Sequence, residues 1–297
     1  MSLNERNESV LADLEATIET YEAADGYRLH YRHWQPGDTP RARIVCLHGI
    51  QSHSGWYLHS SSRMCEAGFE VFYLDRRGSG LNPEKRGHVD NFQILLDDLV
   101  LFLNRVRIQD PRRPVVLVGV SWGGKLATAT AKEHPQMMDA LALICPGLFS
   151  MVDPPWYQQV RIALARVYYR YRHFRIPLTD PELFTATPRW LHFLRSDPLS
   201  LHRATAAMFV TSRRLDWFVR NAPEKISLPT LLMMAGKDQI LDNARTKAYF
   251  EKFAAENKRM IEYADAHHTL EFEPDPEPFI NDLIGWLQEV SCRHPGS

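Results

Sequence analysis

The chain lacks the features that mark several classes of protein. Its four cysteines (Cys46, Cys65, Cys145 and Cys292) lie far apart with no paired spacing, which argues against a zinc site and against a disulfide framework. No stretch approaches the roughly 18 apolar residues of a membrane span, and the polar amino terminus lacks an apolar signal core. The formal net charge is -1, so no global field attracts nucleic acid. We therefore expect a cytoplasmic protein with no nucleic-acid partner and no metal.

The sequence does contain enough apolar residues for a substantial core, since 44% of its 297 residues are hydrophobic. Two extended segments, Thr17 to Ala23 and Tyr27 to Trp34, flank Asp25-Gly26. This dipeptide suits the positive φ angles of a tight hairpin turn, so the two segments predict an antiparallel edge of a sheet.

Six apolar segments that follow predict strands buried on both faces. They are Arg43 to Leu47, Glu70 to Leu74, Val115 to Val120, Ala140 to Cys145, Thr230 to Met234, and Arg259 to Tyr263. Amphipathic segments near 90–107, 122–134, 243–256 and 276–290 predict helices between and after them. Near-continuous Val, Ile and Leu runs that alternate with helices are typical of a parallel sheet. The predicted fold class is therefore α/β, with a mostly parallel eight-stranded sheet covered by helices on both faces.

Residues 151–226 break the alternation of strands and helices. They contain no good strand, many aromatic residues, and 12 lysines and arginines against 6 aspartates and glutamates. A structureless loop of that length is improbable, so we expect a helical insertion between two parts of a core, 1–150 and 227–297, with residues 1–16 forming a flexible or helical extension. The insertion is either a solvated helical face with buried aromatic spacers or a cap that shapes a substrate pocket and touches anionic lipid surfaces.

A serine flanked by glycines follows one of the predicted strands. Gly119-x-Ser121-x-Gly123 lies between the apolar run Val115 to Val118 and the helical run Leu126 to Ala129. This context is typical of a nucleophile elbow, a sharp strand-to-helix turn that exposes the serine hydroxyl. The alternative is a glycine-rich turn with an incidental serine.

A serine nucleophile needs a histidine base and a carboxylate that orients the histidine, in the chain order serine, acid, histidine. Asp238 follows the strand Thr230 to Met234 and is the candidate acid. Its competitor, Asp242, precedes a helical segment and is better suited to be a helix N-cap. Either His267 or His268 could be the base, and neighbouring side chains in an extended chain point in opposite directions, so only one is expected to face Ser121.

Two hydrogen-bond donors must stabilise the oxyanion of a tetrahedral intermediate. Trp122 directly follows the candidate nucleophile and offers its backbone N–H. Gly49 lets the loop after the strand Arg43 to Leu47 turn inward, so we nominate the backbone N–H of Ile50 as the second donor.

With these residues identified, the chain from about residue 20 to 290 resembles the α/β-hydrolase superfamily, and within it the monoacylglycerol lipase and lysophospholipase group. "HGIQSHSGWY" (48–57) resembles the oxyanion loop of that group, "DRRGSG" (75–80) its Asp-x-Arg-Gly-x-Gly turn, "GVSWGG" its elbow and "GKDQIL" (236–241) its acid loop. In the group, x-Leu commonly follows the catalytic histidine, which favours His268, followed here by Thr269-Leu270.

The resemblance implies an α/β-hydrolase fold with a cap and a serine esterase that uses Ser121, Asp238 and His268 without a cofactor. It favours a monoacylglycerol lipase or lysophospholipase activity on an ester or lipid substrate. The alternatives are a short-chain carboxylesterase or thioesterase and, from another class, a non-catalytic ligand-binding protein. The chain departs from the group where Ser52 replaces an acidic residue, Trp56 an arginine, Ser79 a histidine and Trp122 a methionine. A tryptophan beside the nucleophile is expected to narrow the acyl channel.

Overall fold

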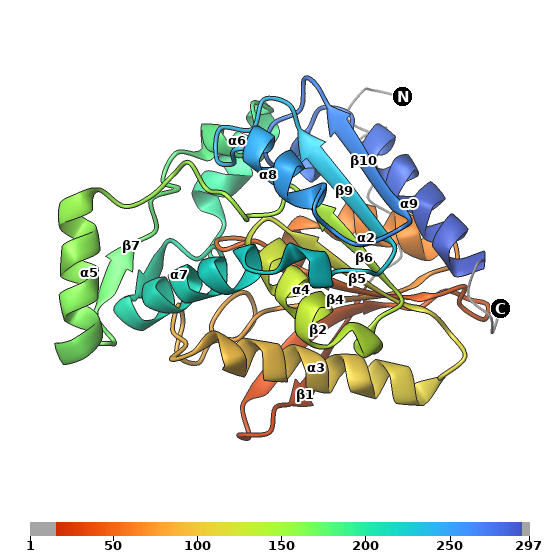
Figure 1. The fold of residues 1–297 in the computed structure, drawn as a ribbon, viewed down its shortest axis with the longest axis horizontal. Coiled ribbons are helices and arrows are strands. Elements are labelled where there is room, and N and C mark those ends of the chain that lie inside the picture. The colour runs from red at the N-terminus through yellow and green to blue at the C-terminus, as the bar shows by residue number, and fades with distance from the viewer. Residues whose placement is uncertain (1–15, 293–297) are drawn as a thin grey trace.

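The computed structural model describes residues 16–292, and an eight-stranded sheet runs through its centre (Figure 1). The strands are β1 (Thr17–Glu22), β2 (Arg28–Trp34), β3 (Arg43–Leu47), β4 (Glu70–Leu74), β5 (Val115–Val120), β6 (Ala140–Ile144), β9 (Thr230–Ala235) and β10 (Lys258–Tyr263). Their order is β1-β2-β4-β3-β5-β6-β9-β10. β1 pairs antiparallel with β2 and β2 antiparallel with β4, whereas all other pairs are parallel. The predicted sheet, including its antiparallel edge, is therefore confirmed.

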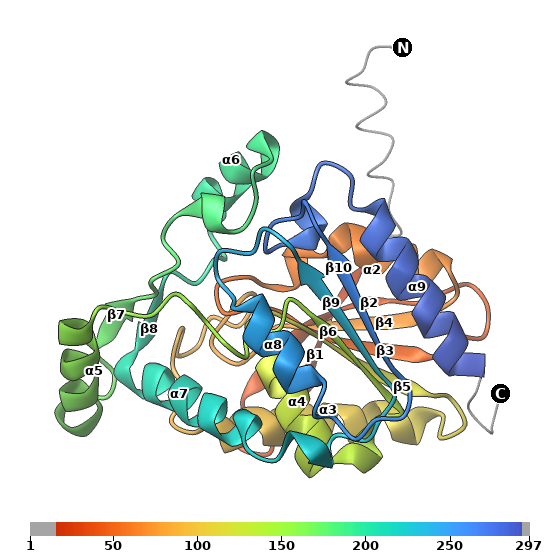
Figure 2. The ribbon, with the colours of Figure 1, turned by 45° about the horizontal axis from the view of Figure 1, so that its top comes forward.

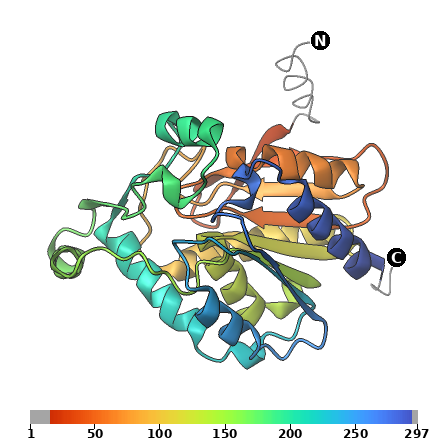
Figure 3. The same cartoon turned by 90° about the horizontal axis from the view of Figure 1, so that it is seen from above.

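Helices cover both faces of the sheet, as Figure 3 shows from above. α2 (Leu58–Glu66) and α9 (Glu277–Cys292) lie on one face, and α3 (Phe92–Gln109), α4 (Trp122–Glu133) and α8 (Asn243–Phe250) lie on the other. The sequence predicted these helices except α2, which buries three consecutive serines, Ser60 to Ser62, and so lacks a clear apolar stripe. α8 ends at Phe250, six residues before the predicted end of that helix at residue 256.

The chain leaves the sheet after β6 and returns to it at β9. The intervening elements are α5 (Trp156–Tyr168), β7 (His173–Arg175), α6 (Pro188–Ser196), β8 (Arg203–Thr205) and α7 (Ala206–Arg220). In Figure 2, α5 and α6 stand away from the sheet, while α7 packs against α4. The expectation that this segment contains no strand was wrong, because β7 and β8 pair antiparallel. Each is only three residues long, too short to produce a recognisable alternation.

Two further features of the structure concern the cysteines and the length of the helices. Cys46 and Cys145, which lie in predicted strands, are buried free thiols. No helix within residues 16–292 is both long and apolar enough to cross a bilayer. The extension predicted for residues 1–16 falls almost entirely outside the described residues.

Candidate active site

Ser121 occupies the sharp turn between β5 and α4, with φ 51° and ψ -121°. This positive φ is strained for a residue with a side chain. Close packing around the turn requires glycines. A Cβ on Gly119 would lie 2.7 Å from the Cα of Gly124, and one on Gly123 would lie 2.5 Å from the carbonyl oxygen of Leu47. The elbow geometry expected from the sequence is therefore present, with glycine needed at both flanking positions.

The structure brings Ser121, His268 and Asp238 together in one chain of hydrogen bonds. The Ser121 Oγ lies 2.9 Å from His268 Nε2, and His268 Nδ1 lies 2.7 Å from Asp238 Oδ2. The other carboxylate oxygen of Asp238 accepts hydrogen bonds from the backbone N–H groups of Ile240 and Leu241. An ionised carboxylate only accepts, so it fixes the proton on Nδ1 and leaves Nε2 free to accept the serine proton.

The two candidate histidines lie in different surroundings. His267 contacts Glu273 through both its backbone N–H, at 2.7 Å, and its ring Nδ1, at 3.0 Å. The structure therefore brings His268 to Ser121 and does not bring His267 there. Asp242, the competing acid, accepts a hydrogen bond from the backbone N–H of Arg245 as the N-cap of α8, as expected.

The two nominated oxyanion donors flank the serine. Trp122 is the first residue of α4, so its N–H has no partner within the helix. Ile50 follows Gly49, where an added Cβ would lie only 3.2 Å from the Cβ of Ser121. The loop thus lies directly against the nucleophile. Within residues 16–292, neither N–H donates to another group of the chain.

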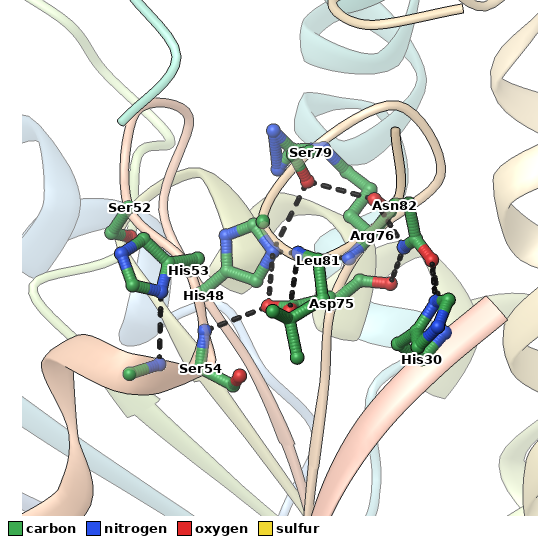
Figure 4. A network of polar contacts seen from close by, with 12 residues as sticks. His30, His48, Ser52, His53, Ser54, Asp75, Arg76, Ser79, Leu81 and Asn82 are labelled. Carbon is green, nitrogen blue, oxygen red and sulfur yellow. Dashed lines mark hydrogen bonds and ion pairs between the residues drawn. The ribbon is translucent and has the colours of Figure 1, made fainter. Parts of the chain in front are cut away.

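Asp75, directly after β4, anchors this loop (Figure 4). Its carboxylate is buried and accepts hydrogen bonds from the backbone N–H groups of Ser54, at 2.7 Å, and Leu81, at 2.9 Å. His48 Nε2 lies 3.8 Å from the same carboxylate. The sequence marked this turn only by its resemblance to a family motif, and its role in holding the oxyanion loop was not foreseen.

Asp197, just after α6, links the segment between β6 and β9 to the same loop. Its Oδ2 accepts hydrogen bonds from Trp56 Nε1 at 2.9 Å and Ser200 Oγ at 2.6 Å, and lies 3.0 Å from His53 Nε2. Burial alone would raise the pKa of Asp197, but the hydrogen bonds from His53, Ser200 and Trp56 outweigh it and hold the pKa below its usual value. Trp56 therefore serves as a structural hydrogen-bond donor in this chain. No sequence pattern indicated this contact.

A cavity of about 300 Å³ opens beside the elbow. Ile50 and Trp122 line it on the side of the sheet, and apolar residues of the segment between β6 and β9 line much of the rest: Val152, Ile162, Ile176, Leu178, Met208 and Phe209. Its polar lining includes the buried ion pair between Lys125 and Asp216, whose closest atoms are 2.5 Å apart. Ser121 and His268 line a smaller neighbouring recess, and Ile50 borders both spaces.

Cys145, Asp238 and His268 place three metal-binding atoms within 4.8 Å of one another. Two of these groups are already joined by the hydrogen bond between His268 and Asp238. Burial raises the pKa of the Cys145 thiol well above its usual value, and a protonated thiol is a poor metal ligand. Asp238 therefore orients His268, and the three groups together are poorly suited to bind a metal ion.

The chain is similar in sequence to one protein family and to several lipases. Residues 38–275 match the model of the family described as "Serine aminopeptidase, S33". The monoglyceride lipase of Rattus norvegicus is 27% identical over 257 residues, which cover 84% of this chain and 82% of that protein. The monoacylglycerol lipase of Mycolicibacterium smegmatis is 25% identical over 275 residues, covering 90% and 95% respectively.

Solved structures agree on the fold. A monoacylglycerol lipase from Paleococcus ferrophilus superposes with a TM-score of 0.76 at 24% identity, covering 88% of this chain and 99% of that one. A soluble variant of the monoglyceride lipase from Saccharomyces cerevisiae, in complex with a substrate analog, gives a TM-score of 0.81 at 19% identity, covering 94% and 96%. The fold is thus the α/β-hydrolase fold, and because the family model matches more than half of its residues, the chain belongs to the serine aminopeptidase S33 family.

Proposed function

We propose that this protein is a serine hydrolase that cleaves carboxylic esters of lipids, with an activity like that of the monoacylglycerol lipases and lysophospholipases. The observation that carries the proposal is the hydrogen-bonded chain from Ser121 through His268 to Asp238, built on a strained elbow. The names of the relatives, monoglyceride and monoacylglycerol lipases, support the substrate class.

In the proposed mechanism, the Ser121 hydroxyl attacks the ester carbonyl while His268 Nε2 takes its proton. The backbone N–H groups of Ile50 and Trp122 donate to the oxyanion of the tetrahedral intermediate. As the intermediate collapses, His268 gives the proton to the leaving alcohol, and an acyl-enzyme remains. A water molecule, deprotonated by His268, then attacks the acyl carbonyl; the second intermediate collapses with loss of the Ser121 oxygen, which takes the proton back from His268, and the carboxylic acid leaves. Every proton moves through protein groups or water, so the reaction needs no cofactor.

The recess beside Ser121 favours an ester over a peptide with a free amino terminus. An aminopeptidase must bind the ammonium group of its substrate, which calls for a carboxylate near the nucleophile. Among the described residues that line the recess, none is Asp or Glu. The adjoining cavity is largely apolar and suits an acyl chain. We propose that residues 151–226 act as a cap, because their side chains line that cavity from the side opposite the sheet.

The test is the substitution Ser121→Ala. On a p-nitrophenyl ester this variant should lose at least about 10³-fold in kcat, because the remaining oxyanion donors cannot replace the nucleophile. The matching p-nitroanilide, assayed beside the ester, separates esterase from amidase activity. Near-normal ester hydrolysis by the variant would rule out this active site.

A fluorophosphonate probe separates the proposed enzyme from a ligand-binding protein with the same fold. The probe should label the wild-type chain at Ser121 and leave Ser121→Ala unlabelled, because only an activated serine attacks phosphorus. A wild-type chain that stays unlabelled while it binds monoacylglycerol would support the non-catalytic alternative.

A short-chain carboxylesterase or thioesterase is the second candidate, and Trp122 is the observation that favours it. The indole ring occupies part of the wall between the elbow and the cap, where it limits the space for an acyl chain. A series of p-nitrophenyl esters, monoacylglycerols and acyl-CoA thioesters of increasing chain length decides between the candidates.

We also propose that α5 provides a peripheral contact with anionic lipid surfaces. Its outer stripe of Trp156, Val160, Leu164 and Val167 is exposed, with Trp156 at 77% and Val167 at 74% exposure. The opposite face, including Ile162 and Ala165, is buried. An exposed apolar helical stripe within a positively charged segment suits the interface of an anionic membrane.

Vesicles containing phosphatidylserine should bind the protein at low salt and release it as the salt concentration rises through about 0.15 M, where the Debye length is about 8 Å. The double variant Trp156→Ser and Leu164→Ser should bind less at every salt concentration and still hydrolyse a water-soluble ester at the normal rate. Equal binding by the variant and the wild type would contradict a contact through α5.

A further inference from the structure

Arg76 follows Asp75 in the turn after β4, and its side chain reaches the oxyanion loop. Its Nη1 donates to the carbonyl oxygen of Gly49 at 3.0 Å, and its Nη2 donates to the carbonyl oxygen of Ile50 at 3.0 Å. We propose that Arg76 is a positioning residue that orients the peptide between Gly49 and Ile50, so that the Ile50 N–H faces the developing oxyanion. This inference rests on the proposed function of Ser121.

Peptide geometry explains how a hydrogen bond to the Gly49 carbonyl oxygen fixes the direction of the Ile50 N–H. The peptide bond is planar and trans, so the Gly49 C=O and the Ile50 N–H point in opposite directions. Holding the oxygen toward Arg76 therefore turns the N–H toward the opposite side of the loop, where Gly49 lies against Ser121. A flipped peptide would turn the carbonyl oxygen toward the oxyanion and repel it.

His48 donates a second hydrogen bond to the Gly49 carbonyl oxygen, and Arg76 determines which ring nitrogen of His48 carries the proton. The backbone N–H of Arg76 donates to His48 Nε2 at 3.0 Å, so the ring proton sits on Nδ1, which lies 2.8 Å from the Gly49 oxygen. Burial and the nearby charge of Arg76 hold the pKa of His48 well below its usual value, so the ring is neutral and keeps this tautomer. Figure 4 shows His48 between the loop and the turn that carries Arg76.

The same guanidinium also contacts the second donor residue. Its central carbon lies 4.7 Å from the centre of the Trp122 ring, a cation–π contact. Arg76 is 9% exposed, and burial lowers its pKa to about 10, so it stays protonated at neutral pH. Within residues 16–292, no carboxylate oxygen lies within 4.0 Å of its nitrogens. Its positive charge, which the charge of the adjacent Asp75 helps to stabilise, favours negative charge at the neighbouring oxyanion site.

The adjacent arginine has a different task. Arg77, at the position of the family arginine in Asp-x-Arg-Gly-x-Gly, pairs with Asp25 and Asp98 away from the loop. Arg76 occupies the variable position of that motif. The contacts with the oxyanion loop are thus made by a residue that the family motif does not specify.

The experiment compares Arg76→Met, Arg76→Gln and Arg76→Lys. Arg86→Met is the matched control, because Arg86 also donates to two carbonyl oxygens, those of Gly80 and Leu199, at 2.8 Å each. Loss of a whole oxyanion donor costs about 10²–10³-fold in kcat, so a donor that is present but poorly oriented should cost about 10- to 100-fold in Arg76→Met. KM should stay within about 3-fold. Arg86→Met should keep kcat.

A transition-state analogue distinguishes a role in orienting the oxyanion donor from a merely structural role. The affinity for a trifluoromethyl ketone, whose hemiketal oxyanion uses the same donors, should fall with kcat, whereas the affinity for an unreactive alcohol of similar shape should not change. Arg76→Gln should recover part of the loss through its amide donors, and Arg76→Lys should lie between wild type and Met.

Two results would overturn the inference: a kcat of Arg76→Met within twofold of wild type, or a fall in kcat without a parallel fall in ketone affinity. If Arg76→Met does not fold, the Gln and Lys variants give the same comparison. Failure of the proposed function would look different, because the wild-type chain itself would neither hydrolyse esters nor react with a fluorophosphonate at Ser121.

Discussion

The indole ring of Trp122 should set the length of acyl chain that the cavity accepts. It lines the cavity, donates from Nε1 to Ser212 Oγ of α7 at 2.9 Å and lies under the guanidinium of Arg76. The cavity of about 300 Å³ holds about ten methylene-sized groups, if each takes about 30 Å³ as a water molecule does in the liquid. We therefore expect wild-type activity to rise with chain length and to level off near about ten carbons.

Trp122→Met should move this limit to longer chains. Methionine has about six fewer side-chain heavy atoms than tryptophan, which leaves room for several methylene groups of about 30 Å³ each. Each additional buried methylene contributes about 0.8 kcal/mol, or about fourfold in kcat/KM. Burial of only two more methylenes should raise the ratio of kcat/KM for long over medium chains by at least about tenfold.

The assay measures kcat/KM for p-nitrophenyl esters from butanoate to dodecanoate and for matching monoacylglycerols, all below their critical micelle concentrations. Ser212→Ala is the control, since it removes the hydrogen-bond partner of the indole and leaves the ring in place. A long-to-medium ratio that agrees within twofold between wild type and Trp122→Met would refute the reasoning. A shift of equal size in Ser212→Ala would show that mobility of α7, and not ring volume, limits chain length.

Four further predictions concern stability. Asp197→Asn should lower the free energy of unfolding at pH 7 by about 1–3 kcal/mol. Because hydrogen bonds hold the pKa of Asp197 below its usual value, this difference should shrink as pH falls below about 4, which urea unfolding at several pH values can measure. Gly123→Ala should cost about 1–3 kcal/mol and reduce kcat, since its Cβ would lie 2.5 Å from the Leu47 oxygen. Gly285→Ala in α9, where a Cβ meets nothing within 4 Å, should stabilise by about 0.5–1 kcal/mol in thermal melts. Ser121→Gly and Ser121→Ala should both be inactive, with the glycine variant more stable by about 1 kcal/mol because φ is 51° at this position. Equal stability of those two variants would mean that the elbow is not strained.

Sequence patterns predicted the parts of the site that depend on local structure. Ser121 directly follows β5, Asp238 lies in the loop just after β9, and His268 lies in the loop after β10. Since the carboxyl ends of parallel strands meet at one edge of a sheet, strand assignment together with the expected chain order of a serine triad indicated that Ser121, Asp238 and one of two histidines come together. Strand positions could not decide between His267 and His268, because that choice depends on which ring turns toward Glu273.

The parts that the sequence did not reveal depend on contacts between distant segments. Arg76 contacts carbonyl oxygens 26 and 27 residues away along the chain, and Asp197 accepts from Trp56 across 141 residues. A buried arginine or aspartate has no periodic pattern that separates it from an exposed one. α2 was missed for a related reason, since its buried positions include three serines and therefore do not form an apolar stripe.

Trp122 joins two regions that are held in different ways. Its backbone belongs to the elbow, where the Ser121 carbonyl accepts hydrogen bonds from the N–H groups of Gly124 and Gly147 and fixes the turn within the core. Its ring belongs to the cavity wall and is held by Ser212 of α7, outside the central sheet. A substitution at this residue can therefore change the acyl-chain preference through the ring while the N–H donor stays in place. Changes that shorten the ring should act on selectivity, whereas changes at Gly123 or Arg76 should act on the chemical step.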